Sequence, residues 1–386
     1  MHIAIDARPA SHPQPGGFKR YTEQLLTALA QTDTRNQYHI YFDRAPARDF
    51  FAGNPNFKIS ILPIRVPALG VLWREQITVA RAAKRNGASV IHFPANASAR
   101  FAACPTVVTM HDIIFLDEKP ELKNLALAEK IKRYGMYRYG RWSAQAAIHQ
   151  AQRLITVSEY SKQKICERYG IAGERCAVVY SGVTQTFRVL PETERQAVQT
   201  KLALPKPFLL GIVSASPRKN AIGLLNAYAA MDATLQEKYD LVLVWTHGLW
   251  QEQLQTRVRD YGLDARVRFI QNVSDEDLVG LMNRAAAFVF PSIEEGFGLP
   301  PLEAMACGAP VIASNRSCIP EILGDAARLV NPTDPVALSR EIEMVLTQPD
   351  LAQEYRARGL KHAARFSWQR CAEQTIQVYQ EASRAH

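Results

Sequence analysis

Short apolar runs recur along the chain, and helical stretches separate them. Most of these runs hold apolar residues at consecutive positions and not only at every second one, which is typical of strands in parallel sheets that are buried on both faces. Helices are predicted between the runs, for example at residues 275–284 and 335–346. Two such series predict an α/β protein with two doubly wound domains. The predicted strands are residues 2–6, 38–42, 58–64, 90–93, 106–110 and 154–158, then 208–213, 241–245, 267–270, 287–290 and 310–313.

The two series meet between residues 184 and 206, where prolines flank a charged helix before a new strand begins. At 386 residues the chain also exceeds what one hydrophobic core usually supports. We therefore expect an N-terminal domain over residues 1–186 and a C-terminal domain over residues 187–366. Residues 367–386 carry apolar side chains at a helical period and are expected to form a helix that returns to the N-terminal domain.

Composition and charge narrow the class of protein only slightly. Six cysteines occur without a CxxC pair or the spacing of zinc ligands, so we expect free thiols. The formal net charge is +9, and residues 1–186 hold 25 basic residues against 14 acidic ones. This excess suits an anionic membrane or a phosphate-bearing substrate; nucleic acid is least favoured, because no binding signature for it is present. Without a signal segment or an apolar run of about 18 residues, we expect a cytoplasmic protein.

Ligands of doubly wound domains bind beyond the carboxyl ends of the strands, so motifs at strand ends are the candidates for function. The most informative one runs from Phe290 through a glycine-rich loop into a helix that we expect to open at Pro300 and Pro301. Gly296 and Gly298 allow the backbone to approach a ligand closely. The free N–H groups at the helix start make a good seat for a diphosphate.

Two carboxylates bracket this loop. Glu295 lies on the loop and Glu303 in the expected first turn of the helix, with seven residues between them. A carboxylate accepts hydrogen bonds from vicinal hydroxyls, so one is suited to a transferred sugar and the other to a ribose. The alternative is a simple strand-loop-helix turn whose acids favour the helix dipole, which does not require the glycines and both acids together.

With this spacing the segment resembles the EX7E signature of retaining glycosyltransferases of the GT-B fold, in family 4 (group 1) of the sequence classification. The likeness continues through residues 307–313 and Pro320-Glu321, and weaker similarity covers nearly the whole chain. The resemblance implies two Rossmann-like domains facing a central cleft. It also implies that Glu295 contacts hydroxyls of the donor sugar and Glu303 those of the ribose. The backbone positions that would hold sugar and phosphates are Gly296, Phe297, Gly298 and Leu299.

A second segment, residues 214–220, follows the first strand of the second half and places two cations where they neutralise a diphosphate leaving group. These are Arg218 and Lys219, in a stretch that resembles the family's Arg-Lys-Asn motif. Val213 and Ser214 stand where many relatives have glycine and arginine. A basic turn without a ligand is the alternative.

Two motifs of the first half also resemble the family. Gly16 and Gly17 lie at an expected strand-to-helix junction, where Gly17 would sit against the donor; a plain helix start is the alternative. They do not form a GxGxxG fingerprint, and no acidic residue stands at the expected place downstream, so the sequence disfavours a nicotinamide enzyme. His111 and Asp112 look like the family's HDxxF-type segment, in which His111 would touch the donor sugar or the reaction centre. Outside the resemblance, a structural histidine is the more common case.

Two further segments keep alternatives open. Asn272 and Val273 follow a strand at the place where related enzymes cradle the nucleotide base with backbone groups, while the acids after them are equally suited to begin a helix. Residues 123–145 interleave basic and aromatic side chains. Such a helix can lie on an anionic membrane, or it can be a solvated helix with an aromatic core face.

The resemblance also implies a mechanism and a donor. Retention in this family is explained by front-face attack, with Glu295, Lys219, Arg218 and His111 as the catalytic group. Because the cations and the helix N-terminus substitute for a divalent ion, we expect no metal and no other cofactor. The chain most resembles bacterial mannosyltransferases of O-antigen and exopolysaccharide assembly, which implies GDP-mannose and a glycan acceptor, lipid-linked through polyprenyl diphosphate. A UDP- or dTDP-sugar donor, or a non-catalytic nucleotide-sugar-binding protein, stays open.

Overall fold

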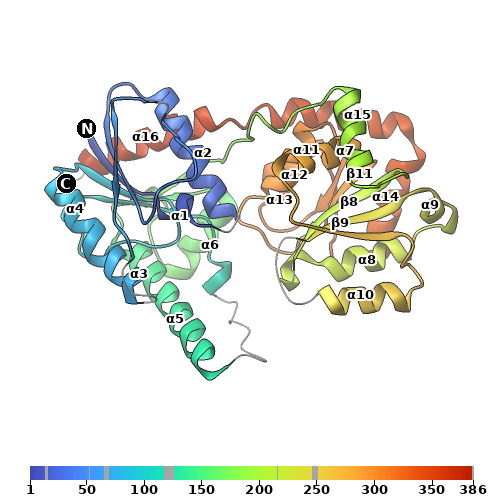
Figure 1. The fold of residues 1–386 in the computed structure, drawn as a ribbon, viewed down its shortest axis with the longest axis horizontal. Coiled ribbons are helices and arrows are strands. Elements are labelled where there is room, and N and C mark those ends of the chain that lie inside the picture. Colours follow the sequence, from blue (N-terminus) through green and yellow to red (C-terminus); the bar gives the residue numbers. More distant parts are fainter. Residues whose placement is uncertain are drawn as a thin grey trace. The chain divides into compact units, whose positions relative to one another are not determined.

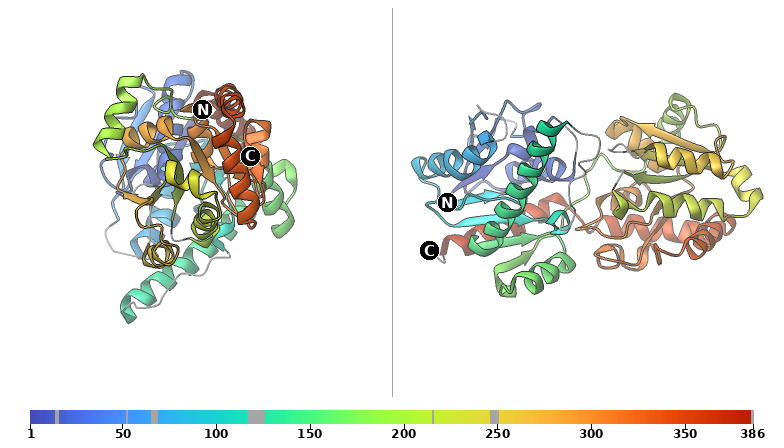
Figure 2. Two further views of the ribbon diagram at one scale, coloured as in Figure 1. Left: turned by 90° about the vertical axis from the view of Figure 1, so that its right-hand side faces the viewer. Right: turned by 90° about the horizontal axis from the view of Figure 1, so that it is seen from below.

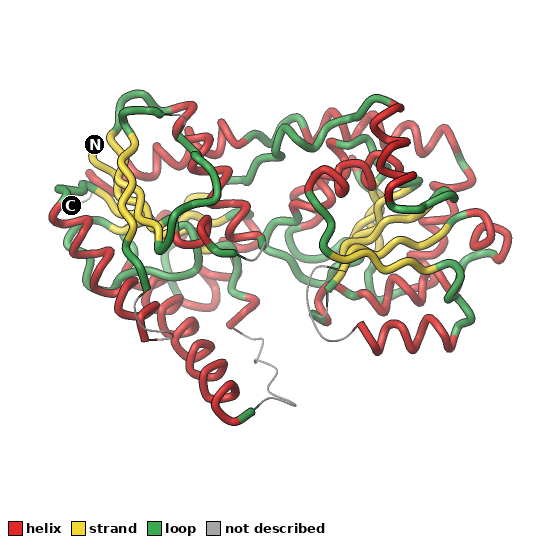
Figure 3. Tube along the Cα trace, in the orientation of Figure 1, coloured by secondary structure: helices red, strands yellow, loops and turns green. Residues whose placement is uncertain are grey.

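The computed structural model describes residues 1–13, 16–51, 53–64, 69–116, 126–214, 216–245 and 251–384. The chain divides into two compact units. Unit 1 comprises Met1–Gly182 together with Ser367–His386, and unit 2 comprises Val183–Phe366. Each unit is built around its own parallel sheet with helices on both faces (Figures 1 and 3), and two further views show the same layers (Figure 2). The predicted α/β class with two doubly wound sheets is confirmed.

The strands of unit 1 pair in parallel, in the order β3-β2-β1-β4-β5-β6-β7. The apolar runs predict the first six, although β3 ends three residues earlier than its run suggests. They do not predict β7, because it has three residues and only the first is buried. The bounds are β1 (His2–Asp6), β2 (Gln37–Phe42), β3 (Phe57–Ile61), β4 (Val90–Phe93), β5 (Thr106–Met110), β6 (Arg153–Thr156) and β7 (Cys176–Val178).

The longest helix of unit 1 is α5, and the last helix of the chain, α16, packs against α2 and against the strands β4, β5 and β6. Its buried side chains recur at a helical period, as a helix with one face on a core requires. The helical elements are α1 (Arg8–Ser11), α2 (Gly17–Thr32), α3 (Leu69–Trp73), the π-helical η1 (Arg74–Thr78), α4 (Val79–Arg85), η2 (Ile114–Leu116), α5 (Leu127–Gln150), α6 (Glu159–Tyr169), η3 (Gly173–Arg175) and α16 (Trp368–Arg384).

The strands of unit 2 are also parallel, in the order β10-β9-β8-β11-β12-β13. The apolar runs predict all of them except β13, a three-residue strand that is only partly buried. The bounds are β8 (Phe208–Val213), β9 (Asp240–Trp245), β10 (Val267–Gln271), β11 (Ala287–Phe290), β12 (Val311–Ser314) and β13 (Arg328–Val330).

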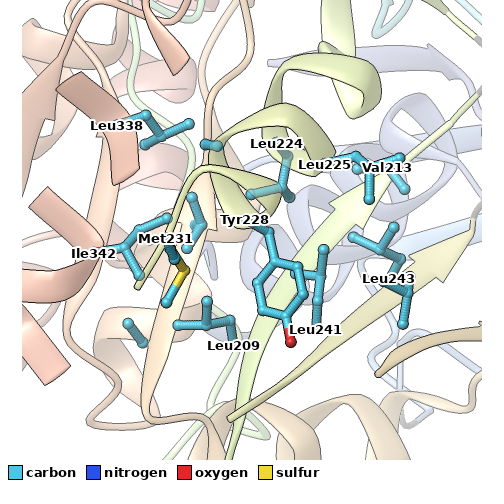
Figure 4. Close-up of a cluster of buried hydrophobic side chains, with 14 of the residues drawn as sticks. Leu209, Val213, Leu224, Leu225, Tyr228, Met231, Leu241, Leu243, Leu338 and Ile342 are labelled. Carbon is cyan, nitrogen blue, oxygen red and sulfur yellow. The ribbon is translucent and has the colours of Figure 1, made fainter. Parts of the chain in front are cut away.

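Helices α8, α10 and α14 cover one face of this sheet, and α11, α12 and α15 cover the other (Figure 1). On the first face, leucines of β8 and β9 pack against α8 and α14 in one buried cluster (Figure 4). The helical elements are α7 (Glu192–Lys201), η4 (Pro217–Lys219), α8 (Ala221–Ala229), α9 (Ala233–Lys238), α10 (Gln251–Asp260), α11 (Asp275–Arg284), α12 (Leu299–Ala306), α13 (Ile319–Leu323), η5 (Gly324–Ala326), α14 (Pro335–Thr347) and α15 (Pro349–Ala363).

Each sheet has a point where the chain reverses the direction in which it adds strands. In unit 1 this switch lies between β1 and β4, and in unit 2 it lies between β8 and β11. Connections that leave neighbouring strands in opposite directions open a crevice beyond their carboxyl ends, which is where doubly wound proteins bind ligands. The residues after β8 and β11 are therefore the first to inspect in unit 2.

Candidate active site

The glycine-rich loop leaves β11 and enters α12 through a left-handed residue. Gly298 has φ +93° and caps α12, and a Cβ atom there would lie 2.7 Å from the Cδ1 atom of Ile319. Only glycine meets both conditions without strain. The helix begins at Leu299 and not at Pro300, so Glu303 lies in its second turn and the expectation of a first-turn position is wrong. The left-handed Gly298 caps the helix, so α12 begins one residue before the two prolines.

Glu295 lies at the centre of a charged cluster that joins the two segments at the switch. Its Oε1 atom accepts hydrogen bonds from Lys219 Nζ at 2.6 Å and from the Ser292 hydroxyl at 2.6 Å, and its Oε2 atom accepts one from Arg218 at 3.1 Å. The side chains come from positions 76 and 77 residues apart. The structure thus brings together three of the four residues expected to be catalytic.

The protonation of Glu295 follows from this setting. The residue is only 8% exposed, and burial alone would raise the pKa of its carboxyl. The charges of Lys219 and Arg218 and the hydrogen bonds from Lys219 and Ser292 outweigh burial, so the pKa stays below its ordinary value. Three of about four acceptor positions on the carboxylate are used, which leaves room for one ligand hydroxyl.

The basic segment after β8 is fixed to the glycine-rich loop by its backbone. The Arg218 carbonyl accepts from the Ile293 N–H at 2.7 Å, and the Ser292 hydroxyl oxygen lies 3.0 Å from the same carbonyl oxygen. Asn220 adopts a left-handed conformation with φ +52°, caps α8 by accepting from the Gly223 N–H, and donates to the Pro332 carbonyl at 2.7 Å. Ala215 of this segment lies outside the described residues. The turn therefore holds its two cations toward Glu295.

The remaining donor-loop residues lie beside this cluster. Phe297 is buried and packs edge-on against Phe366, with ring centres 6.1 Å apart. Glu303 is 2% exposed. Burial and then the Glu303 charge raise the pKa of the Cys307 thiol to about 12. Gly296 is buried, and Leu299 is part-exposed.

Asn272 and Val273 lie elsewhere on the same edge. They follow β10, an edge strand that β9 and β8 separate from β11. Asn272 is exposed and left-handed, with φ +53°. The acidic residues after it do begin a helix: Ser274 caps α11, and Asp277 forms an ion pair of 2.7 Å with Lys201. A role for the preceding pair in holding a base stays a prediction.

In unit 1, Gly17 is the first residue of α2, capped by Gly16, and both glycines are exposed. They do not directly follow the first strand, because the short helix α1 intervenes; the expected strand-to-helix junction is therefore wrong. The extra helical turn begins at Arg8 because Pro9 favours the first positions of a helix. Phe18, next in the chain, lies with its ring centre 5.0 Å from that of His111.

His111 follows β5 and is held in one orientation. Its backbone N–H donates to Asn96 at 2.8 Å, and its Nε2 atom lies 3.1 Å from the Pro94 carbonyl oxygen. A carbonyl can only accept, so Nε2 carries the proton and Nδ1 is left as an acceptor. Burial lowers the pKa of His111 to about 4, which keeps the ring neutral near pH 7.

A hydrogen-bonded chain that the sequence pattern does not reveal runs beneath His111. His92 is fully buried and binds the Tyr379 hydroxyl at 2.7 Å through Nδ1 and the Thr109 hydroxyl at 2.9 Å through Nε2. The Thr109 hydroxyl also meets that of Tyr21, whose ring lies edge-on to His111. The C-terminal helix thus shares a polar network with the strand ends of unit 1.

His92 makes the stability of unit 1 depend on pH. Burial and the nearby His111 lower the pKa of His92 to about 3, against about 6.5 in an unfolded chain. Because the unfolded state binds the proton first, stability falls as pH drops from about 6.5 toward 3, by about 2 kcal/mol at pH 5 for this group. We expect His92→Gln to remove that part of the pH dependence in urea unfolding at pH 7 and pH 5.

The matched control for this experiment is His149→Gln, since the His149 side chain is exposed. It should retain the pH dependence of the wild type. An unchanged dependence in His92→Gln would mean that His92 takes up a proton in the folded state.

The structure contradicts one of the two interpretations of residues 123–145, the solvated helix with an aromatic core face. Residues 123–125 lie outside the described part of the chain, and the rest begins α5. The buried side chains of α5 are Ser143, Ala144, Ala147 and Ile148. Of its aromatic side chains, Tyr134 and Trp142 are exposed and Tyr137 and Tyr139 are part-exposed. An aromatic core face is therefore wrong, because small residues let this helix pack closely on the sheet.

Two structural features are absent from the described residues. No helix among them is both long and apolar enough to cross a membrane. Within the same residues, no group of three or more His, Cys, Asp or Glu side chains is placed to hold a metal ion.

Comparison with known proteins defines the class. Residues 192–362 match the family model described as glycosyl transferases group 1, and residues 15–186 match the model described as glycosyltransferase family 4. The second match includes the strands β2 to β7 of unit 1, and the first includes the strands β8 to β13 of unit 2. The chain belongs to the family 4 (group 1) glycosyltransferases of the GT-B fold.

Among individual proteins, the chain is 36% identical over 240 residues to the serotype-specific mannosyltransferase WbdA of Escherichia coli, a match that covers 61% of this chain and 29% of WbdA. It is 34% identical over 244 residues to the O-antigen chain mannosyltransferase B of Escherichia coli, with 63% of this chain and 64% of that protein covered. The chain thus matches less than two thirds of the length of these relatives. The fold resembles that of Anabaena HepE in complex with UDP-glucose, with a TM-score of 0.72, 17% identity, and 99% and 100% of the two chains covered.

Proposed function

We propose that this chain is a retaining glycosyltransferase that moves mannose from GDP-mannose to a hydroxyl of a glycan acceptor in surface-glycan synthesis. The observation that carries the proposal is the cluster of Glu295, Lys219 and Arg218 at the switch between β8 and β11. Two cations and a helix N-terminus meet there, which suits a diphosphate leaving group. The names of the curated relatives support mannose as the sugar and an O-antigen glycan as the acceptor.

In the proposed reaction, the acceptor oxygen bonds to C1 of the sugar on the face from which the diphosphate leaves. The C1–O bond to the diphosphate breaks, and a diphosphate oxygen takes the acceptor proton. Lys219 and Arg218 stabilise the charge that develops on this group, and no divalent ion is needed. Glu295 holds both cations in place and uses its remaining lone pair for a hydroxyl of the sugar.

Other parts of the donor have their own proposed partners. The backbone N–H groups from Gly296 to Leu299 hold the phosphates, Glu303 holds the ribose hydroxyls, and Asn272 with Val273 faces the base. Gly17 is proposed to lie against the donor. His111, neutral and with Nδ1 as an acceptor, is proposed to receive a hydrogen bond from the sugar.

Thermal unfolding of the purified protein with a panel of nucleotides, in EDTA, tests the donor site. A ligand that binds only the folded state raises the unfolding midpoint. We expect GDP and GDP-mannose to raise it in the wild type and to have no effect on Glu303→Ala. A shift with UDP or dTDP instead would favour another donor, which the likeness to a protein solved with UDP-glucose keeps in view. No shift with any nucleotide would contradict a donor site.

Catalysis and metal independence are tested by transfer itself. Wild-type turnover in EDTA equal to that without it, together with loss of turnover in Glu295→Ala, is the expected outcome. Activity that EDTA abolishes and manganese restores would contradict the metal-free mechanism. Donor binding without any turnover would indicate a non-catalytic binding protein.

We further propose that α5 lies on the inner face of an anionic membrane, where a polyprenyl-diphosphate acceptor would be found. Leu127, Ile131 and Trp142 are exposed on this helix, and so are the basic Lys132 and Arg133. Basic and aromatic side chains together suit such a surface. We expect sedimentation with vesicles containing phosphatidylglycerol, and not with phosphatidylcholine alone.

The double variant Leu127→Gln and Ile131→Gln should lose vesicle binding. The control is Val336→Gln, a change at an exposed apolar residue of unit 2 that should leave binding unchanged. Equal sedimentation of all three proteins would contradict a membrane-bound α5.

A further inference from the structure

A second group of buried charges lies in unit 1, at the carboxyl edge of its sheet, and the proposed donor contacts do not use it. Its centre is Glu75, which is 2% exposed. One carboxylate oxygen pairs with the Arg8 guanidinium at 2.6 Å, and the other accepts from the Tyr139 hydroxyl at 2.6 Å. The glutamate thus ties the turn after β1 to helix α5.

The backbone is distorted where this glutamate lies. The helical run from α3 to α4 is interrupted by the π-helical turn η1, which begins with Arg74, Glu75 and Gln76. These three consecutive polar side chains are all buried, although neighbours on a regular α-helix point in different directions. π-Helical turns are rare and occur frequently at functional sites. The distortion therefore indicates that this edge of unit 1 is a candidate functional site.

The neighbours of Glu75 are fixed as firmly. Arg74 binds both carboxylate oxygens of Asp6, at 2.8 and 3.0 Å, at the end of β1. Gln76 donates to the Ser98 carbonyl at 2.7 Å and accepts from the Arg100 N–H at 2.8 Å. The strand ends and α5 are thereby locked around Glu75.

Arg8 differs from the rest of this network. Its side chain is 28% exposed, against 3% for that of Glu75. Its Nε atom is buried and has no hydrogen-bond partner among the described residues. Among the described residues Glu75 accepts from the Nη2 atom alone, so guanidinium donors other than the buried Nε are available to a ligand that approaches the exposed part of the side chain.

The charges around Arg8 select the kind of ligand. Burial would lower the pKa of Arg8, but Glu75, Asp6 and Asp43 together raise it. Arg74 offsets Asp6, and the mostly exposed Arg44 pairs with Asp43, so the network carries no excess positive charge. The carboxylates of Glu75, Asp6 and Asp43 would repel a phosphate or carboxylate ligand at close range. Neutral hydroxyls would not be repelled.

We propose that Arg8 binds two neighbouring hydroxyls of a neutral sugar of the acceptor, and that Glu75 and Tyr139 are positioning residues that hold its guanidinium. The naming of this sugar as the acceptor rests on the proposed glycosyl transfer; the binding of a neutral sugar at Arg8 does not. A planar fork of N–H donors matches two vicinal hydroxyl oxygens, and Lys cannot reproduce it.

Binding of methyl α-D-mannopyranoside to the full chain, measured by saturation-transfer NMR with GDP present, tests this without turnover. We expect Arg8→Met to weaken binding at least tenfold and Arg8→Lys to recover little of it. Arg81→Met, an exposed change on α4, should bind as the wild type does. The midpoint shift caused by GDP should be the same in all variants, because Arg8 is not assigned to the donor.

Mannose 6-phosphate serves as the charged comparison probe. Unchanged mannoside binding in Arg8→Met, or tighter binding of mannose 6-phosphate that Arg8→Met abolishes, would overturn the proposal. If Arg8→Met does not fold, Tyr139→Phe decides: it keeps the ring but loses the hydroxyl that fixes Glu75. Weaker binding of the mannoside by Tyr139→Phe, with an unchanged unfolding midpoint, supports the proposal. Binding with wild-type affinity overturns it.

Kinetics separate this proposal from the proposed function. If the enzyme transfers mannose, Arg8→Lys should raise the KM for the acceptor at least tenfold and leave the KM for the donor unchanged. If no transfer occurs but mannoside binding still depends on Arg8, the sugar site stands and the proposed function fails.

Discussion

Replacing Lys219 by methionine is expected to lower kcat for glycosyl transfer by about 10²–10³-fold, the usual cost of removing one group that stabilises transition-state charge. Lys219 donates to Glu295 at 2.6 Å and lies over the Phe290 ring, 5.2 Å from its centre. The variant loses a cation beside the leaving diphosphate and also leaves Glu295 with one ion-pair partner in place of two. Steady-state kinetics with GDP-mannose and a mannoside acceptor measure the effect.

The control is Lys206→Met, which removes a half-exposed lysine of the same unit that donates to the Glu237 carbonyl at 3.1 Å and lies 3.9 Å from the Asp240 carboxylate. It should retain kcat. Thermal unfolding distinguishes catalysis from folding, because the midpoint of Lys219→Met should stay near that of the wild type. A kcat within about threefold of the wild type would contradict the assignment of Lys219 to the leaving group.

Replacing Arg74 by methionine is expected to destabilise unit 1 by about 3–5 kcal/mol, which is typical when one partner of a buried ion pair is removed. Arg74 is 1% exposed, and its guanidinium satisfies Asp6 and the carbonyls of Leu62 and Tyr41. Methionine fills most of the volume but leaves the buried Asp6 carboxylate without its ion-pair partner. Urea unfolding at pH 7 measures the loss.

The double variant Asp6→Asn with Arg74→Met should recover part of this stability, because removing both charges is less costly than stranding one. Arg81→Met, on an exposed face, should change the free energy of unfolding by no more than about 0.5 kcal/mol. A loss below about 1 kcal/mol in Arg74→Met would mean that water reaches Asp6.

Local pattern predicts the fold well where a segment is long enough to show a period. The apolar runs give all strands of five or more residues, because apolar side chains cluster in them even at the sheet edges, where β3 and β10 also carry exposed polar residues. They miss β7 and β13, whose three residues each are too short for any period and only partly buried. They also place the start of α12 one residue late, since proline is a strong helix-start signal but the left-handed Gly298 sets the actual cap.

The sequence likewise predicts some features of the candidate site and not others. Glu295 and Lys219 are predictable as members of one site, because both follow strands and strand ends share one edge of a sheet. Their ion pair is not predictable, since it joins side chains 76 residues apart. The same holds for Arg8 and Glu75, 67 residues apart, and for His92 and Tyr379, 287 apart.

The division of the chain has a consequence for its synthesis on the ribosome. Unit 2 is one continuous stretch, Val183–Phe366, whereas unit 1 needs Ser367–His386 as well as Met1–Gly182. While unit 2 emerges, the nascent unit 1 still lacks α16, so His92 has no Tyr379 hydroxyl and the side of α2 that α16 contacts stays uncovered. The part that is translated first is therefore completed last, and until α16 emerges the apolar surface that α16 will cover is exposed to aggregation.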